Sequence, residues 1–350
     1  MKTRRQFVNH VLAALGAGAL GCRGSSCGSQ PGADNGLVRS PGAPRSDSGG
    51  PHYLALEKSG ELARREEALF EIFKSCELCP RKCGVNRLEG EKGVCSSTAQ
   101  LKVASAGPHF GEEWPLVGRG GSGTIFFSNC NLLCCYCQNW EIAHRGQGSF
   151  TSHEQLAETM ISLQNRGCHN INLVTPTHIV PHFVRALRIA VNRGLTLPLV
   201  YNTGGYDNIE VIRMLDGIVD IYLPDFKYQD GALAAKYSNE ATDYPEVARQ
   251  VIKEMYRQVG DIQTSSLLGV ARRGLMLRHL VLPHNIAGTD RFVKWVAKEL
   301  SPDTYTNLMD QYHPSHRATK YPQINRRITK EEWRRALTWA KQAELTRLDS

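Results

Sequence analysis

The chain has 350 residues, of which 41% are hydrophobic, and this length and composition exclude a fibrous or wholly disordered protein. The formal net charge is +8, but Lys and Arg alternate with acids, as in residues 328–342, so no nucleic-acid partner is expected. Eleven cysteines, several of them closely spaced, are the unusual feature of the composition.

Residues 1–22 have the features of a targeting signal. Arg4-Arg5 and a short apolar run resemble a twin-arginine export signal, and the segment that ends at Cys22 resembles a lipoprotein processing box. The apolar run is too short to span a bilayer. Residues 23–52 are rich in Gly, Ser and Pro, which predicts a disordered linker. We therefore expect an exported or membrane-associated protein, with a cytoplasmic location as the alternative.

A cysteine-rich N-terminal region is predicted for residues 53–110. It opens with the apolar periodicity of an amphipathic helix and continues into four closely spaced thiols, which are Cys76, Cys79, Cys83 and Cys95. Their spacing suits tetrahedral sulfur coordination, by zinc or by a second iron–sulfur cluster. Two local disulfides are the alternative.

The central motif follows a segment of strand character at 123–129. Cys130, Cys134 and Cys137 follow one another with gaps of three and two residues. Three thiolates so placed can hold three corners of a four-iron cube and leave the fourth iron open for a substrate, whereas clusters that only carry electrons normally have four protein ligands. A zinc site or plain buried thiols are the alternatives.

The rest of the chain alternates between strand and helix patterns. Besides the strand around Phe126, apolar runs occur at 170–174, 197–201, 219–223, 275–282 and 305–309, with helical periodicity between several of them. This predicts an α/β fold, a partial (β/α)6 barrel over residues 111–345 that a helix at 329–345 closes. In such barrels the chemistry takes place at the carboxyl ends of the strands.

The pattern CxxxCx(aromatic)C, with Tyr136 as its aromatic residue, resembles the signature of the radical S-adenosylmethionine (SAM) superfamily. The segments CELCPRKCGVNR, NLVTPTH, YNTGGYD, DIYLPDFKY, RHLVLPHN and MDQYHPSHRA are similar to the PflX-type branch, relatives of the pyruvate formate-lyase activating enzymes. The resemblance covers roughly residues 70 to 340. It implies that Cys130, Cys134 and Cys137 hold a [4Fe–4S] cluster whose fourth iron takes the amino and carboxylate groups of SAM. Cys135 and Cys168 are then spare.

The activity implied by the resemblance is reductive cleavage of SAM to a 5′-deoxyadenosyl radical that abstracts hydrogen. A glycyl-radical protein is the first candidate substrate, and another peptide or a small molecule is the second. The electron would come from a low-potential donor of the flavodoxin or ferredoxin type. A non-catalytic electron-transfer iron–sulfur protein is the alternative from a different class.

Polar residues at the predicted strand ends are candidates for SAM contacts. With Tyr136 these are Thr175, Thr177, His178, Asn202, Thr203, Asp225 and Lys227. Many activating enzymes carry Gly-Gly-Glu where this chain has Thr-Pro-Thr-His, so the partner of the SAM amine stays open. Asp225 and Lys227 could instead pair with each other. His178 and His182 lie four residues apart, and we favour capping or cofactor contact over a metal for them.

Overall fold

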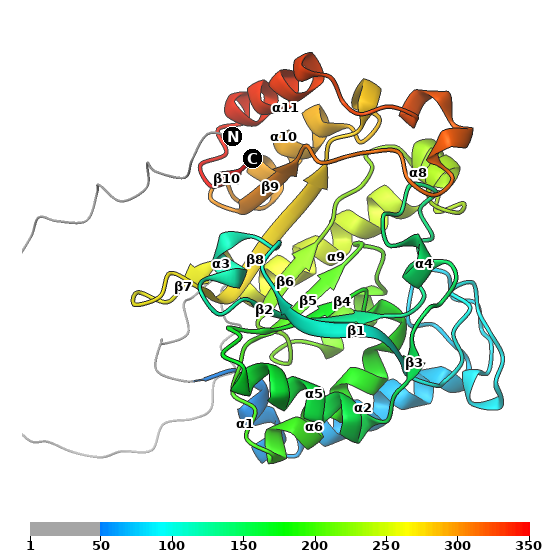
Figure 1. The fold of residues 1–350 in the computed structure, drawn as a ribbon, viewed down its shortest axis with the longest axis vertical. Coiled ribbons are helices and arrows are strands. Elements are labelled where there is room, and N and C mark those ends of the chain that lie inside the picture. Colours follow the sequence, from blue (N-terminus) through cyan, green and yellow to red (C-terminus); the bar gives the residue numbers. More distant parts are fainter. Residues whose placement is uncertain (1–49) are drawn as a thin grey trace, which may run out of the picture. The chain divides into compact units, whose positions relative to one another are not determined.

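The computed structural model describes residues 50–350 (Figure 1). The predicted signal at 1–22 and the predicted linker as far as residue 49 lie outside the described residues. Within 50–350, no helix combines the length and the apolar character needed to cross a membrane.

Six parallel strands form the body of the fold and confirm the predicted α/β barrel strands. In spatial order they are β2 (Ser122–Phe127), β4 (Ile171–Val174), β5 (Leu199–Thr203), β6 (Ile221–Pro224), β8 (Ala271–Leu280) and β9 (Tyr305–Met309). Their carboxyl ends share one edge, so the polar residues that follow them are brought together.

Short strands that the sequence patterns did not predict extend this sheet. β1 (Lys102–His109) pairs antiparallel with β2, and β3 (Ser149–Phe150) pairs with β1. At the other edge, β10 (Leu348–Asp349) runs parallel to β9, while β7 (Gln263–Thr264) forms a hairpin with β8. β1 escaped prediction because its sequence, KVASAGPH, contains Gly, Pro and small residues in place of the branched and aromatic residues typical of strands.

Helices pack on the outer face of the sheet. The longer ones are α1 (Tyr53–Lys58), α2 (Glu61–Glu71), α5 (His153–Asn165), α6 (Val180–Asn192), α7 (Ile209–Met214), α8 (Gly231–Tyr237), α9 (Tyr244–Val259), α10 (Thr289–Glu299) and α11 (Lys330–Gln342). The short ones are α3 (Trp114–Val117), α4 (Trp140–Ala143), η1 (Ile72–Lys74), η2 (Arg87–Glu89), η3 (Thr177–Ile179), η4 (Pro283–Asn285), η5 (Ala318–Lys320) and η6 (Pro322–Ile324). α2, α5 and α6 lie side by side (Figure 1), and α11 confirms the predicted closing helix.

The two faces of the sheet belong to different cores because side chains alternate along a strand. Leu199 and Tyr201 of β5 join the large core beneath the helices, whereas Val200 joins a small separate cluster on the inner face. Leu116 of α3 completes that inner cluster. The short helix α3 therefore covers the inner face of the barrel.

An ion pair holds the segment before α3 on the inner face. The Arg278 guanidinium of β8 donates to both carboxylate oxygens of Glu113, each at 2.7 Å, and also to Glu112. The Asn307 amide of β9 donates to Glu113 at 2.8 Å. Burial opposes the charge of Glu113, but the guanidinium and the amide hold its pKa below the usual value.

The burial of Asp220 can be tested through the pH dependence of the free energy of unfolding. This buried carboxylate accepts hydrogen bonds from the backbone N–H groups of Leu199 and His52, and burial raises its pKa to about 7. Because the native state holds this proton more tightly than the unfolded chain does, Asp220 contributes stability below about pH 4. That contribution is lost as the pH rises to about 7.

We predict that Asp220→Asn becomes more stable relative to the wild-type chain as the pH rises from about 4 to about 7, by up to about 1.4 kcal/mol per pH unit. Above pH 7 the difference should be constant. Urea unfolding of both proteins at several pH values measures the difference in their free energies of unfolding. If this difference did not change with pH, the raised pKa of Asp220 would be contradicted.

Candidate functional site

The site is built on the loop that follows β2. Asn129, two residues after the end of β2, has a φ of 75°, and its N–H donates to the carbonyl of Ile142. The Asn131 amide then donates to the carbonyl of Tyr206 at 2.6 Å. Hydrogen bonds of Asn129 and Asn131 therefore fix the backbone on either side of Cys130.

The three predicted cluster ligands lie near one another in this loop, because the Cys130 and Cys134 thiols both act electrostatically on the Cys137 thiol. Cys134 is buried, and Cys130 and Cys137 are partly exposed at the rim. The backbone N–H of Leu132 donates to the Cys130 sulfur at 3.4 Å, and the Ser238 hydroxyl donates to the Cys134 sulfur at 3.0 Å. Hydrogen bonds of this kind stabilise thiolates.

Burial without a metal keeps these thiols protonated. It raises the pKa of Cys134 to about 11 and that of Cys137 to about 12, and it raises the pKa of Cys130 as well. The ammonium of Lys227 acts in the opposite direction on all three. Metal binding must therefore release protons, as is general for cysteine ligands.

The donor set fits an iron–sulfur cluster. It consists of soft sulfur ligands in one loop, with N–H and O–H donors to sulfur and a single nearby ammonium group. Among residues 50–350 as placed, no group of three or more His, Cys, Asp or Glu side chains surrounds a position for a metal ion. The fit therefore rests on the chemistry and proximity of the thiols.

The backbone of Cys135 is hydrogen-bonded to segments outside the cysteine loop. Its N–H donates to the carbonyl of Tyr237 and its own carbonyl accepts from the N–H of Arg317, both at 2.8 Å. Its thiol is buried, which raises its pKa to about 12. Cys168 is likewise buried, on the opposite side of β2 near Gly123.

Asp225 and Lys227 pair with each other at the carboxyl end of β6, at 2.6 Å. Burial disfavours the ammonium, but Asp225 and Cys134 keep the pKa of Lys227 well above its usual value, so it stays charged. The pair lies at the mouth of the barrel beside the cysteine loop. The ion pair is one of the two roles that the sequence left open, and a contact with SAM stays a prediction.

Tyr136 supports the loop from within the protein. It is buried, accepts a hydrogen bond from the Tyr228 hydroxyl at 2.7 Å and packs edge-on against Tyr312. The hydroxyls of Tyr228 and Ser238 are 2.9 Å apart, and Ser238 contacts the Cys134 sulfur. Tyr136 is thus connected to the cluster ligand through side chains that are distant in sequence.

Thr177 and Thr203 share one buried carboxylate, Asp207, which sequence reasoning missed. The two threonine hydroxyls donate to Asp207 at 2.6 and 2.7 Å, and the Tyr201 hydroxyl donates at 2.8 Å. Burial raises the pKa of Asp207 and these donors oppose the rise. The available signal was an acid directly after Gly-Gly-Tyr, close behind a predicted strand.

Thr175 and Asn202 join the ends of β4 and β5. The Thr175 N–H donates to the Asn202 carbonyl at 2.8 Å, and Thr175 has a φ of 59°. A positive φ is strained for a β-branched residue, and such strain gathers at functional sites.

His178 and His182 do not act as a pair. The His178 ring bonds the Ser128 carbonyl at 2.8 Å, and burial lowers its pKa to about 4, so it is neutral. His182 instead bonds His153 at 2.9 Å, ring to ring. The two histidines therefore serve separate parts of the barrel.

The four N-terminal cysteines are gathered by tight backbone turns. The backbone of Cys76 bonds that of Val85 and Gly84, and the N–H of Lys82 donates to the Cys79 carbonyl. A Cβ on Gly93 would lie 2.4 Å from the Cys83 sulfur, so only glycine allows this approach. The thiols of Cys76 and Cys95 each influence the Cys79 thiol electrostatically.

Arg87 is the organising side chain of this region. It is buried, and its guanidinium donates to the carbonyls of Thr98 and His178, at 2.6 and 2.7 Å, while lying 4.4 Å above the Phe73 ring. The same region is tied to the cluster loop, because Arg81 donates to the carbonyls of Asn131 and Ser238. The two cysteine groups thus form neighbouring parts of one site.

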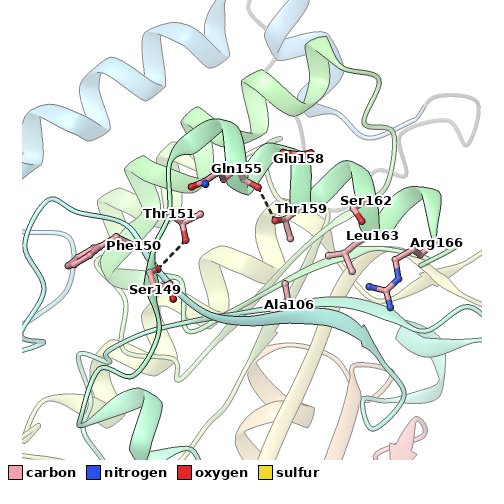
Figure 2. Close-up of a pocket in the computed structure, with 10 residues that line it drawn as sticks. All are labelled: Ala106, Ser149, Phe150, Thr151, Gln155, Glu158, Thr159, Ser162, Leu163 and Arg166. Carbon is pink, nitrogen blue, oxygen red and sulfur yellow. Dashed lines mark hydrogen bonds between the residues drawn. The ribbon is translucent and has the colours of Figure 1, made fainter.

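A hollow between β1 and α5 is distant from this chemistry (Figure 2). It is lined by Ala106, Ser149, Phe150, Thr151, Gln155, Glu158, Thr159, Ser162, Leu163 and Arg166. Two of its hydroxyls, of Thr151 and Thr159, already donate to nearby backbone carbonyls. It contains no cysteine, and nothing in its lining points to a cofactor.

A parallel barrel with a three-cysteine loop at a strand end defines a metal-dependent α/β protein, and comparison with known proteins identifies the family. Residues 124–231 match the model of the Radical SAM superfamily. The uncharacterized protein MJ0674 of Methanocaldococcus jannaschii is 30% identical over 302 residues, covering 83% of this chain and 82% of that protein. The chain belongs to the radical SAM superfamily. Membership implies an enzyme with a [4Fe–4S] cluster and SAM.

Two solved structures are similar at a lower level. TsrM from Kitasatospora setae, a radical S-adenosylmethionine methyltransferase with cobalamin and a [4Fe-4S] cluster bound, is 17% identical with a TM-score of 0.38, covering 54% of this chain and 36% of that chain. TYW1 with a lysine-pyruvate adduct bound is 11% identical with a TM-score of 0.39, covering 64% and 73%. This chain thus spans about a third of TsrM, and likenesses at this level support no inference about activity.

The contacts of Arg87 predict a large effect on stability. Arg87→Met should lower the free energy of unfolding by about 2–4 kcal/mol, because it leaves two buried carbonyls without their donor. Urea unfolding measures the change. Arg64→Met is the matched control, because Arg64 on α2 is exposed and pairs only with Glu61 on the surface. Equal loss in both variants would contradict the role assigned to Arg87.

Proposed function

We propose that this protein is a radical SAM enzyme of the PflX-type, activating-enzyme-like branch, which holds its [4Fe–4S] cluster on Cys130, Cys134 and Cys137. The observation that supports the proposal is the proximity of these three thiols in the loop after β2, where each also feels the buried Lys227 ammonium. The backbone of the adjacent Cys135 is bonded away into the protein. Three ligands leave one iron for SAM, which an electron carrier does not need.

A cluster held by Cys130, Cys134 and Cys137 would supply the electron for breaking the C5′–S bond of SAM, which gives methionine and a 5′-deoxyadenosyl radical. The residues of the chain hold and shield this chemistry. Lys227 offsets part of the negative charge of the thiolates, and with Asp225 it presents a cation and an anion to the carboxylate and amine of SAM. The buried tyrosines behind the loop exclude water from that side.

A glycyl-radical protein is the proposed substrate, and radical modification of another peptide or a small molecule is the second candidate. The support is the resemblance of the segments at residues 70–340 to the PflX-type branch. The four thiols of Cys76, Cys79, Cys83 and Cys95 are proposed to hold zinc or a second iron–sulfur cluster. They lie next to the first site, since Asn131 of the cluster loop also bonds the Cys79 thiol.

We predict that alanine at Cys130, Cys134 or Cys137 removes the iron that anaerobic reconstitution installs at this loop and lowers 5′-deoxyadenosine formation with dithionite and SAM to the blank. Cys135→Ala is the matched control, because it removes a neighbouring buried thiol of the same loop. This variant should keep both the iron and the formation of 5′-deoxyadenosine. Iron and zinc are measured together by mass spectrometry, with electron paramagnetic resonance for the reduced cluster.

The same measurements test the second site. Cys79→Ala should lose zinc, or part of the iron, while the signal of the first cluster remains. If the wild-type protein binds iron but forms no 5′-deoxyadenosine, the result would favour the alternative that the protein is a non-catalytic electron carrier. Iron retained in all three loop variants would exclude the assigned ligands.

For the substrate, we predict that incubating the reduced enzyme and SAM with a glycyl-radical protein of the same cell generates a glycyl radical signal in electron paramagnetic resonance. The Cys134→Ala variant should generate none. Production of 5′-deoxyadenosine without any such signal would favour the second candidate class of substrate.

A further inference from the structure

Three aromatic rings form a stack beside the cluster loop, outside the barrel mouth. The indole of Trp140 in α4 stacks on His316 with ring centres 5.2 Å apart and an angle of 16°, and His316 lies 4.3 Å from His144. The Nε2 atom of His144 is 3.0 Å from the carbonyl oxygen of Cys134. The stack therefore leads from partly exposed rings to the backbone of a proposed cluster ligand.

A rim of cations surrounds this stack. Arg145 is exposed and lies 4.4 Å above the Trp140 ring, while Arg317 and Lys320 are exposed on the segment after β9. The pKa of His316 is lowered, mainly by burial and further by the charges of His144 and of these three cations. Within residues 138–147 and 311–325, Glu141 is the one acid in the sequence.

Backbone bonds attach this surface to the cluster loop. The N–H of Arg317 donates to the Cys135 carbonyl, and the N–H of Cys135 donates to the Tyr237 carbonyl at the end of α8. Lys236 of α8 lies over the rings of Tyr237 and Tyr321 and adds a further exposed cation. Figure 1 shows α4, α8 and the segment after β9 on the same side of the barrel.

We propose that this surface, formed by the ring stack and the cations Arg145, Arg317, Lys320 and Lys236, docks an acidic, low-potential one-electron carrier protein. The inference rests on the proposed function, because it needs a cluster on the adjacent loop. The carrier is oxidised by one electron and the cluster is reduced by one, and no bond forms or breaks. A basic surface speeds the encounter with an acidic partner.

Among the described residues, this surface differs from other exposed groups in that it contacts the cysteine loop. The exposed leucines at 267 and 268 lie on the β7–β8 hairpin, which projects from the barrel in Figure 1, and no recorded contact links them to the cysteine loop. The mouth itself holds Asp225 and Lys227, where SAM is proposed to bind. The ring stack instead contacts the loop through His144 and the Cys134 carbonyl.

The test uses the reconstituted full chain and an acidic bacterial flavodoxin as the probe. The variant Arg145→Glu with Lys320→Glu reverses two exposed charges, and Lys294→Glu with Lys298→Glu on α10 is the matched control of equal charge change. Titration by calorimetry at several salt concentrations gives the Kd. Stopped-flow absorbance gives the rate at which flavodoxin hydroquinone reduces the cluster.

We expect the Arg145/Lys320 variant to bind flavodoxin at least tenfold more weakly, with a smaller salt dependence, and to be reduced by it at least tenfold more slowly. The control should match the wild-type chain in both measurements. The amplitude of the dithionite-reduced signal in electron paramagnetic resonance should be equal in all three proteins, which shows that the cluster is intact.

An unchanged Kd and reduction rate in the Arg145/Lys320 variant would overturn the proposal, as would equal weakening in the α10 control. A neutral variant, Arg145→Gln with Lys320→Gln, should show an intermediate loss. If the wild-type chain takes up no cluster or forms no 5′-deoxyadenosine with dithionite, the proposed function fails instead, and the binding titration still reports on the surface.

Discussion

The burial of Cys134 and the partial burial of Cys130 and Cys137, after one strand, are the constraint on which the site depends. A buried thiol resists ionisation, so a loop that must present thiolates to iron needs groups that stabilise negative sulfur. Ser238 and the backbone of Leu132 donate to the sulfurs, and the Lys227 ammonium favours their ionised form. These groups come from three separate parts of the chain, and the barrel holds them together.

The surrounding structure fixes the loop from two sides. On one side Arg81 clamps the carbonyls of Asn131 and Ser238, so that the cysteine-rich region packs against the cluster loop. On the other side Tyr136 and Tyr228 form a buried hydroxyl pair that leads to Ser238. Because ordered backbone and side-chain contacts hold the thiols before metal arrives, less conformational entropy remains to be lost on binding.

Sequence reasoning succeeded where the information is local. The alternation of apolar runs with helical periodicity predicts the six parallel strands, and the spacing of Cys130, Cys134 and Cys137 predicts the cluster ligands. It missed β1 and the roles of Asp207 and Arg87, whose partners lie far along the chain. Thr177 illustrates the limit, because its position at a strand end was predictable but its bond to Asp207, thirty residues away, was not.

Acidic and basic side chains alternate along the inner side of the barrel. This alternation explains why several charged side chains can be buried there. Glu113 pairs with Arg278, the charge of Asp225 acts on both Arg278 and Lys227, and Lys227 acts on Cys134. Each charge thus has an opposite neighbour, which offsets part of its desolvation cost. Adding negative charge at the sulfurs strengthens their attraction to Lys227, while Asp225 keeps Arg278 as a second cation. The alternation therefore lets this part of the barrel mouth accept an anionic cluster while Glu113 and Asp225 keep their cationic partners.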